Sequence, residues 1–472
     1  MAFVLHAHLP WAKVADGELP LRWHGEAYRQ VYAPLLDLLE QLPGDSGPWL
    51  TVSLSPSLLE TWAQPDWPEA LRRSIDEVSR GIALLGSAGL PDAPLEALRT
   101  ELAAGHQRLA ANQADPAKAF ASEAAQYKVE LWSSTATHAL LPVMHAIPGA
   151  VRAQMTVAQR CFETRIGRQA RGLWLPECGW SPDLLPALEA AGVPETVVDH
   201  TDDPDADFPA PQYCPTGLTV WPRQRGLSEA VWSARVGYPG HPAYREFHRD
   251  AADVFAHLNS DDASLLAAGL KCWSVTGKAE KDWYHPARAT EQAKADADAF
   301  VERLERLAQK ALAGRPPLVV LPFDAELFGH WWFEGPQWLS RVLERTHDRA
   351  GRLQATTPGA YRQCYGAAPA GHGPPPSSWG RGGDFRQWVN ARTSWIYPPL
   401  TSLADTELRT AACALNSLHP QTDPESEAAR HWLLAQASDW PFMLSNNVLP
   451  DLAEARLRHH FKEVESRVRP RR

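Results

Sequence analysis

The chain has 472 residues, a formal net charge of −10 at pH 7 and an apolar share of 44%. That apolar share is ample for a large core, so intrinsic disorder is not the expected state of the chain. The negative net charge and the lack of a basic stripe argue against nucleic acid and anionic membranes as partners. No apolar run reaches the ~18 residues of a membrane span.

Short apolar segments with the character of strands alternate along the chain with amphipathic segments. Strands are predicted at residues 2–8, 49–54, 173–176, 195–199, 271–275 and 317–323, and helices at 26–41, 122–132, 287–312 and 336–349. This alternation predicts an α/β fold with a largely parallel sheet, either open or closed into a barrel.

Three longer regions interrupt or follow this alternation. Residues 65–121 are rich in Ala, Leu, Glu and Arg and show no strand pattern, which predicts an inserted helical segment. Residues 202–240 carry many Pro, Gly and Asp residues and are predicted to form a long loop. Beyond a Pro- and Gly-rich linker at 366–376, the residues up to 472 have helical patterns and predict a helical C-terminal part.

Acidic, histidine and tryptophan side chains follow the predicted strand at 317–323. Asp324 ends it, and Glu326, His330, two tryptophans and Glu334 come next. In barrel enzymes the catalytic groups lie at the carboxyl ends of strands, where acids transfer protons and indoles offer flat faces to sugar rings. The alternative is a solvated strand end whose charges are satisfied.

Residues 172–180 repeat this pattern, because an apolar strand ends in Glu177 between Trp174 and Trp180. Taken alone, Glu177 could be a neighbour of a helix N-cap. Beside Asp324 it offers the second acid that glycoside chemistry requires, and a retaining mechanism places the two carboxyl groups about 5–5.5 Å apart.

His6 and His8 end the first predicted strand, and the period of two places both imidazoles on one face. They could bind a metal, hydrogen-bond the hydroxyls of a substrate, or be satisfied core histidines. The metal hypothesis needs further ligands from other strand ends, for which His138 and Asp324 are candidates.

Aromatic residues mark two later segments. Residues 376–397 contain Trp379, Trp388 and Trp395 among small residues, which suits polysaccharide binding or packing between domains. Tyr238 stands between a glycine and a proline, as at the tip of a loop that folds over a cleft or in an ordinary surface turn.

The six cysteines are dispersed without a CxxC pair, so we expect a reduced, cytoplasmic protein rather than a disulfide framework or a structural zinc site. The first ten residues have neither a basic segment nor a long apolar run, and no signal peptide is expected there. Tryptophan is frequent, with 20 copies against 10 tyrosines, and this surplus suggests a lined groove in addition to a core.

Together these segments resemble glycoside hydrolase family 57, and within it the 1,4-α-glucan branching enzymes. Residues 6–10, 137–142, 174–178, 323–335 and 377–385 are similar to the five family motifs in turn. Residues 237–240 with 244–247, and 435–443, resemble the branching-enzyme subgroup, and the likeness runs from residue 3 to about 460.

The resemblance implies a fold and an activity. The fold is an incomplete (β/α)₇ barrel over residues 1–366, which includes the helical insertion at about 65–121 and the loop at about 202–240. A C-terminal α-helical domain follows at 367–472 and adds aromatic residues to the groove. The activity is cleavage of α-1,4-glucan and transfer of the chain to a 6-hydroxyl with retention, without cofactor or metal.

The resemblance also implies roles for single residues. Glu177 takes the place of the nucleophile and Asp324 that of the acid/base, while Tyr238 takes that of the covering loop. The implied substrate-binding residues are His6, His8, His138, Trp273, Trp379, Trp388 and Asp439.

Three departures from the family pattern concern the covering loop and its surroundings. The segment 222–232 is short, His241 stands where an acidic residue is usual, and residues 278–284 are trimmed. An α-amylase-like hydrolase or a 4-α-glucanotransferase on the same scaffold therefore remains the alternative. A metal-dependent hydrolase and a non-catalytic glucan-binding protein are further hypotheses.

Overall fold

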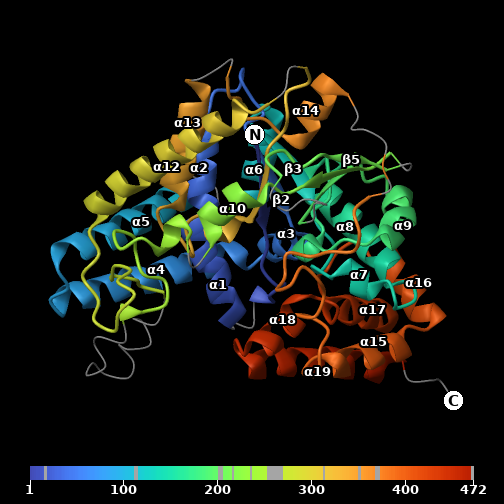
Figure 1. Cartoon of the computed structure of the whole chain (residues 1–472). Coiled ribbons are helices and arrows are strands. Elements are labelled where there is room, and N and C mark those ends of the chain that lie inside the picture. The colour runs from blue at the N-terminus through green and yellow to red at the C-terminus, as the bar shows by residue number, and fades with distance from the viewer. Residues whose placement is uncertain are drawn as a thin grey trace.

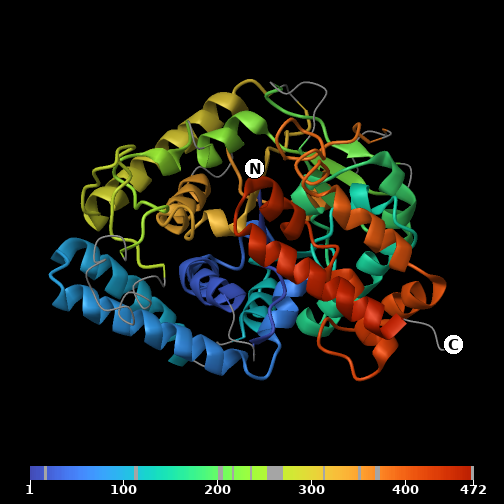
Figure 2. The same ribbon diagram turned by 90° about the horizontal axis from the view of Figure 1, so that it is seen from below.

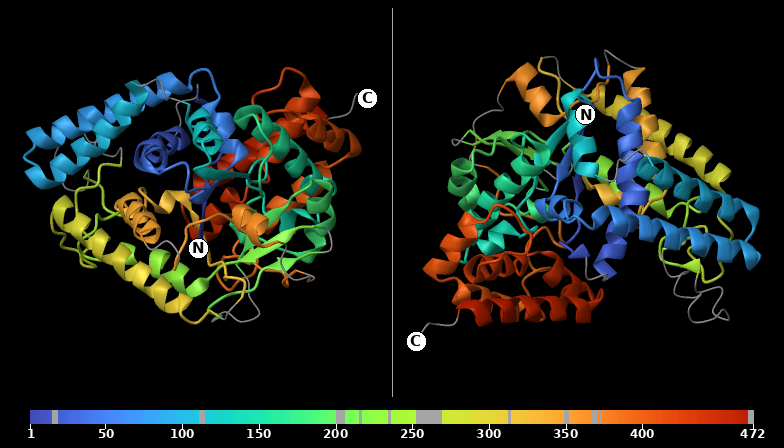
Figure 3. Two further views of the ribbon diagram at one scale, coloured as in Figure 1. Left: turned by 90° about the horizontal axis from the view of Figure 1, so that it is seen from above. Right: turned by 180° about the vertical axis from the view of Figure 1, so that it is seen from behind.

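The computed structural model describes residues 1–14, 19–110, 115–199, 206–214, 217–233, 236–251, 269–311, 314–348, 352–366, 371 and 373–468. Parallel strands occupy its centre and helices surround them, as the view from above in Figure 3 shows. Parts of the expected loop (202–205, 215–216 and 234–235) and of the expected linker (367–370 and 372) lie outside the described residues.

The strands form one interrupted ring. They are β1 (Ala2–Ala7), β2 (Leu50–Leu54), β3 (Val129–Ser133), β4 (Glu195–Val198), β5 (Gln212–Tyr213), β6 (Thr219–Pro222) and β7 (Val320–Asp324). Parallel pairing gives the order β3-β2-β1-β7 in one sheet, and β4 pairs with β6 in the other, whose antiparallel edge is β5.

Two connections join these sheets into a barrel. Leu173 forms parallel bridges to both Ser133 and Thr196, so the segment around it is the seventh parallel strand, between β3 and β4. On the other side, the backbone N–H of Gln224 donates to the carbonyl oxygen of Val320 at 3.0 Å, just beyond β6. The expected incomplete (β/α)₇ barrel is thereby confirmed.

The helices of the barrel region are α1 (Leu19–Ala27), α2 (Ala33–Gln41), α3 (Pro56–Trp62), α4 (Trp67–Ser87), α5 (Asp92–Ala110), α6 (Pro116–Ala125), α7 (Leu141–Met144), α8 (Ala150–Ile166), α9 (Leu185–Ala190), α10 (Arg225–Trp232), α12 (Pro286–Ala308), α13 (Gly335–His347) and α14 (Pro358–Tyr365). The last part of the chain forms α15 (Tyr397–Leu403), α16 (Thr406–Ala414), α17 (Pro424–Leu434), α18 (Asp439–Asn446) and α19 (Pro450–Val468). In Figure 1, α4 and α5 project to one side of the barrel, and α15 to α19 gather beneath it. No helix of the described residues is both long and apolar enough to cross a membrane.

The two faces of β1 explain how the strand positions its polar end. Phe3 and Leu5 pack toward the outer helices, where Phe3 meets the ring of Trp338 in α13 at 6.1 Å. Ala2 and Val4 lie on the opposite face, in the cluster of large side chains that fills the barrel interior. Side chains alternate along a strand, so the next even-numbered residue, His6, also faces the interior.

The register of the sheet brings His6 beside the acid at the end of β7. In the parallel pairing of β1 with β7, His6 lies opposite Asp324. Paired residues of neighbouring parallel strands point to the same face of a sheet. Asp324 therefore points into the carboxyl end of the barrel, where the ring of His6 stacks on Trp174 at 4.7 Å.

Two predicted elements are wrong. The helix expected at 122–132 ends at Ala125, and β3 begins at Val129, because Tyr127 adopts a positive φ of 62° that breaks the helix. The strand expected at 271–275 is no member of the barrel, since Trp273 and Ser274 form only isolated antiparallel bridges to Trp283 and Arg245.

The segment 202–240 differs from a loop without elements of its own. Within its described part it contains β5, β6 and α10, and β6 is a strand of the barrel. The short strand is hidden in the sequence because only four residues, Thr219 to Pro222, pair with β4, and a proline ends them. Helix α10 then begins after Gln224, whose side chain accepts a hydrogen bond from the N–H of Leu227.

The helices at the end of the chain cover the carboxyl ends of the strands, and Figure 2 shows them crossing that end of the barrel. Glu60 of α3 is fully buried at this contact. Its carboxylate accepts hydrogen bonds from Arg165 Nε at 2.7 Å and from the backbone N–H of Leu418 at 3.1 Å, and His419 Nε2 lies 3.2 Å away. Glu60 thus ties α3 and α8 to the turn before α17.

Replacing Glu60 with alanine is expected to lower the free energy of unfolding by about 3 kcal/mol, because the Leu418 N–H and the Arg165 guanidinium lose a buried acceptor. Urea unfolding of the whole chain measures this change. Glu163→Ala, at an exposed site of α8, is the matched control and should change the free energy by less than about 0.5 kcal/mol. Equal losses in the two variants would contradict the assignment.

Candidate active site

Glu177 lies in a tight turn directly after the strand around Leu173. Its φ of 62° is in the left-handed region, as is that of Cys178 at 48°. A non-glycine residue in this region stores strain that the surroundings must hold. The backbone N–H of Trp379 donates to the carbonyl oxygen of Glu177 at 3.0 Å and holds the turn from the far side.

Two donors orient the Glu177 carboxylate. Trp379 Nε1 donates to its Oε2, and Ser438 Oγ donates to its Oε1, both at 2.8 Å. Burial raises the pKa of Glu177 above its ordinary value, and these two hydrogen bonds counteract part of the rise. The carboxylate is therefore fixed in one orientation in a site largely shielded from water.

Asp324 differs from Glu177 in its surroundings. Within the described part of the chain no hydrogen bond reaches its carboxylate, which is partly exposed. Burial in the barrel end, followed by the charges of Glu326, Glu177 and Asp439, raises the pKa of Asp324 well above its ordinary value. The pKa values of both acids are raised, and only that of Glu177 is lowered in part by hydrogen bonds to its carboxylate.

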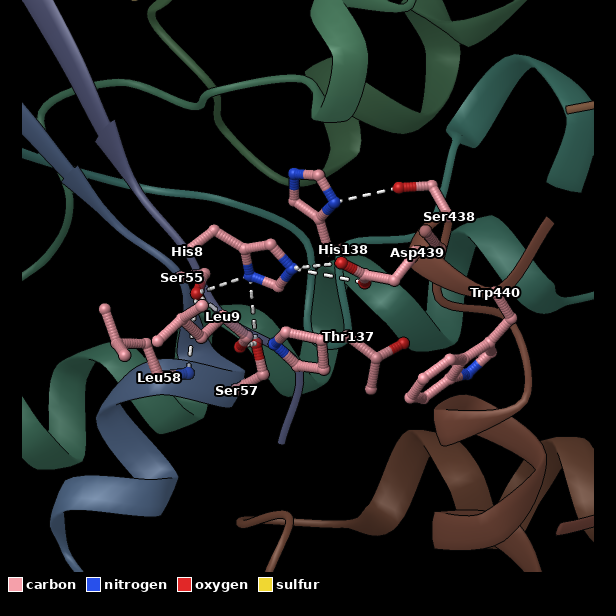
Figure 4. A network of polar contacts seen from close by, with 12 residues as sticks. His8, Leu9, Ser55, Ser57, Leu58, Thr137, His138, Ser438, Asp439 and Trp440 are labelled. Atoms are coloured by element: carbon pink, nitrogen blue, oxygen red, sulfur yellow. Dashed lines mark hydrogen bonds and ion pairs between the residues drawn. The ribbon is translucent and has the colours of Figure 1, made fainter. Parts of the chain in front are cut away.

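His8 is held on both sides of its ring, as Figure 4 shows. Its Nδ1 lies 2.9 Å from Ser55 Oγ, and its Nε2 lies 3.2 Å from Asp439 Oδ2. Burial opposes the charge on Asp439, but the charge and hydrogen bond of His8 outweigh this and hold the pKa of Asp439 below its usual range. The contact between His8 Nε2 and Asp439 therefore joins the barrel to α18.

His138 connects the contact between His8 and Asp439 with Glu177. Its Nδ1 lies 2.8 Å from Ser438 Oγ, the same hydroxyl that donates to Glu177, and its φ is 60°. The backbone N–H of Ser438 donates to the carbonyl oxygen of His138 at 3.0 Å. Burial, followed by the charge of His8, lowers the pKa of His138 well below its ordinary value, so its ring is neutral at pH 7.

The three histidines His6, His8 and His138 lie close enough to suggest a metal, since one nitrogen of each lies within 4.8 Å of the others. Their rings, however, are stacked. His8 and His138 are 3.8 Å apart at 12°, and His6 and His138 are 5.0 Å apart at 14°. Imidazole binds a metal in the plane of its ring, so parallel rings do not aim their lone pairs at one point. The arrangement favours hydroxyl binding over chelation.

Two predicted stacking platforms are core residues. Trp273 is 7% exposed, and its ring stacks on Trp283 at 4.1 Å and lies 5.0 Å from the guanidinium carbon of Arg249. Trp388 is 1% exposed, and the missing side chain of Gly380 makes room for its ring. Both rings are covered in this structure, and their roles as stacking platforms stay predictions. The sequence shows how often tryptophan occurs but not which rings are covered.

Trp379 and Tyr238 remain partly exposed, in different places. Trp379 touches Glu177 and meets Trp174 edge to face at 5.3 Å, which places it beside the acids. The ring of Tyr238 packs near Trp332 and Trp338, at 6.1 and 5.9 Å, beside α13. Burial and the charge of a nearby α12 carboxylate raise the pKa of Tyr238 to about 12. Here Tyr238 is docked on the helices and not extended over the acids.

The sequence reasoning missed Ser438, Ser55 and Tyr32. Ser438 was one residue from the predicted Asp439, and its place before an acid at the start of α18 was the available signal. Ser55 orients His8, and Tyr32 donates a hydrogen bond to Glu326, which also accepts one from the backbone N–H of His8 at 3.1 Å. Glu326 thus connects Tyr32 with the backbone of His8.

Removing the hydroxyl of Ser438 should slow the reaction without removing an acid. Ser438→Ala deprives Glu177 of one donor, so we expect turnover at neutral pH to fall about ten- to hundredfold, as for the loss of a hydrogen bond to a charged group. The ionised form of Glu177 becomes less stable, its pKa rises further, and the acid limb of the pH–rate profile moves to higher pH.

A pH–rate profile measures both effects of this change. Ser87→Ala, at an exposed site near the end of α4, is the control and should leave the profile unmoved. A lower rate in Ser438→Ala with an unshifted acid limb would show that Ser438 does not control the pKa of Glu177.

Comparison with known proteins finds two families that match most of the chain. The family "Glycosyl hydrolase family 57" matches residues 2–366, and "1,4-alpha-glucan branching enzyme, C-terminal" matches residues 416–468. A "1,4-alpha-glucan branching enzyme" of Thermococcus kodakarensis is 27% identical over 98% of this chain and 72% of its own length. A protein of Mycobacterium tuberculosis named "Probable 1,4-alpha-glucan branching enzyme" is 31% identical over 97% of this chain and 89% of its own.

Solved structures show the same relationship. The family 57 branching enzyme from Thermococcus kodakaraensis, in complex with glucose and additives, superposes with a TM-score of 0.84 at 25% identity and covers 98% of this chain and 89% of that one. An alpha-amylase from Thermotoga maritima gives a TM-score of 0.82 at 28% identity, over 98% and 92%. The resemblance drawn from the motifs is confirmed: the chain belongs to glycosyl hydrolase family 57, among its 1,4-alpha-glucan branching enzymes.

Proposed function

We propose that the protein cleaves α-1,4-glucan and joins the freed chain to a glucan 6-hydroxyl, with Glu177 as nucleophile and Asp324 as acid/base. One observation carries this assignment. The Glu177 carboxylate is oriented by Trp379 and Ser438, whereas the Asp324 carboxyl has a strongly raised pKa and no protein partner among the described residues. Environments that push the pKa values of two neighbouring acids apart give one acid the role of nucleophile and the other the role of proton transfer.

In the first step, an oxygen of Glu177 attacks the anomeric carbon of the donor sugar. Asp324 gives its proton to the glycosidic oxygen, the bond to the departing chain breaks, and a β-glycosyl ester of Glu177 forms. The departing chain has received the proton, and Asp324 is left ionised. Its raised pKa favours recovery of a proton in the next step.

In the second step, the ionised Asp324 takes the proton of a 6-hydroxyl on the acceptor chain. The acceptor oxygen attacks the anomeric carbon, the ester bond to Glu177 breaks, and an α-1,6 linkage forms. Two inversions at one carbon give net retention. The acids return to their starting forms, so the cycle is balanced and consumes nothing besides the two glucans.

The last helices take part in this site under the proposal. Ser438 touches the nucleophile and Asp439 holds His8, so the barrel alone would lack both contacts. We assign to His8 and His138 the binding of donor hydroxyls, and to Trp379 a wall of the donor site. The division into a catalytic part at 1–366 and a helical part at 367–472 is proposed on the same ground.

Hydrolysis is the second candidate, and two observations favour it. The alpha-amylase from Thermotoga maritima resembles the chain about as well as the branching enzyme does, with a TM-score of 0.82. The ring of Tyr238 packs against Trp332 and Trp338, and this contact gives Tyr238 a position other than that of a cover over the intermediate.

Incubation with amylose tests the choice. We expect a proton spectrum of the product to show new α-1,6 anomeric signals that outnumber the new reducing ends. Reducing ends without α-1,6 signals would establish a hydrolase, and a change in chain lengths with neither signal would establish a 4-α-glucanotransferase. The proposed setting is the cytoplasm, where buried free thiols such as Cys161, Cys178, Cys214 and Cys272 persist.

A further inference from the structure

A second histidine cluster lies in the last helices of the chain. His431 belongs to α17, and His459 and His460 belong to α19; one nitrogen of each lies within 4.8 Å of the others. His431 and His460 are buried, whereas His459 is exposed and opens the cluster to solvent. We propose that these three histidines bind a divalent transition-metal ion such as Zn²⁺, at a site separate from the two acids.

The angles between the rings distinguish this cluster from the stacked histidines of the active site. The His431 ring lies at 49° to that of His460 and at 77° to that of His459, and the latter two are at 54°. Each imidazole binds a metal in its own plane. Rings that are tilted in this way can direct their lone pairs at one point between them.

Glu427 sets the tautomer that a metal ligand requires. Its Oε1 lies 3.0 Å from His431 Nε2, so a proton on Nε2 leaves the lone pair on Nδ1. A carboxylate behind a ligating histidine is a common arrangement around protein-bound zinc. His431 Nδ1 faces His460 Nδ1 at 2.8 Å, and the two would separate to about 3.4 Å around an ion with metal–nitrogen bonds of about 2.0–2.1 Å.

The surrounding charges leave the cluster able to accept a cation. Two arginines lie close to the cluster. Arg430 NH1 is 3.3 Å from His431 Nε2 and is paired with Glu427 Oε1 at 2.9 Å, and the charge of Arg456 acts on His459 and His460. Glu463, one turn beyond His459 on α19, pairs with Arg467.

The position of the cluster indicates what the ion would do. The site joins α17 to α19, and α17 leads directly into Ser438 and Asp439, which touch the nucleophile and His8. A bound ion would therefore fasten the two helices that hold this segment in place. Binding to the folded chain alone raises its stability, whichever glucan reaction the acids perform.

The test uses the full chain without a polyhistidine tag, freed of metal with a chelator and titrated with ZnCl₂ in a calorimeter. We expect one Zn²⁺ per chain and an unfolding temperature about 3 °C higher at a hundredfold excess over the dissociation constant. His459→Asn removes the exposed ligand and should weaken binding at least tenfold. Glu427→Gln keeps all three ligands and should weaken it about 10- to 100-fold.

His145→Asn, at another exposed histidine, is the matched control and should bind zinc as the unchanged chain does. His459 lies on the surface, so the metal-free variant should unfold at the temperature of the metal-free parent. Absence of zinc binding by the parent would overturn the proposal. So would tight binding that survives His459→Asn, and loss of that binding in His8→Asn would move the metal to the stacked histidines.

Discussion

Glu177→Gln is expected to abolish turnover of amylose, with a loss of at least about 10⁴-fold, because an amide oxygen does not form the glycosyl ester. Glutamine has the size of glutamate; its carbonyl oxygen can accept the hydrogen bond of Trp379 Nε1, and its amide N–H can donate to Ser438 Oγ. The fold and the binding of glucan should therefore remain. Initial rates and glucan binding, measured on the same preparation, separate loss of chemistry from loss of substrate.

Azide gives this prediction a stereochemical control. In Glu177→Ala a small anion can enter the space left by the carboxylate and attack the anomeric carbon from the same side. The product is then a β-glycosyl azide, with inverted configuration, formed from an α-linked or α-fluoride donor. An α-glycosyl azide from this variant, or turnover of Glu177→Gln near that of the parent, would remove Glu177 from the role of nucleophile.

The acids could be predicted from the sequence because a strand end is a local signal. An apolar run followed by a carboxylate places the acid at the rim of a barrel, and the register of β1 with β7 then sets His6 beside Asp324. His138 could be expected near His8 because both follow strands of the same barrel, whereas the stacking of their rings was visible only in the structure.

The tryptophans and Ser438 could not be assigned in the same way. Whether the face of an indole is free depends on which residues cover it, and Trp273 is covered by Trp283, a contact that no periodicity shows. Ser438 reaches Glu177 across 261 residues of chain, through the docking of the last helices on the barrel. Such contacts follow from tertiary packing, which can also override local helix propensity, as at β3.

The raised pKa of Asp324 has a consequence for stability as well as for catalysis. Folding favours the protonated form of Asp324. Its contribution to the free energy of unfolding is therefore complete at pH values below the ordinary pKa of 3.8, and this contribution is lost as the pH rises through the higher pKa of the folded chain. Asp324→Asn removes the buried charge. We therefore expect this variant to unfold at a higher temperature than the parent at pH 8, and at nearly the same temperature at pH 4, in thermal scans.

Asp324→Asn is also expected to slow the cleavage of amylose about 10²- to 10⁴-fold, since the departing chain no longer receives a proton. A maltooligosaccharide α-fluoride does not need that proton, because fluoride leaves as an anion. Formation of the glycosyl ester from the fluoride should thus be reduced less than tenfold, measured as the first burst of fluoride release. Equal losses on amylose and on the fluoride would contradict the role of Asp324 as the acid.

The second half of the reaction gives an independent test of the same carboxyl group. Without Asp324 as a base, a 6-hydroxyl attacks the glycosyl ester slowly, whereas azide needs no base. Azide should accelerate turnover of the fluoride by Asp324→Asn and yield an α-glycosyl azide, the configuration opposite to that from Glu177→Ala. Opposite products from the two variants would place the acids on opposite faces of the sugar, as two successive inversions require, whereas one shared product would leave the two roles unseparated.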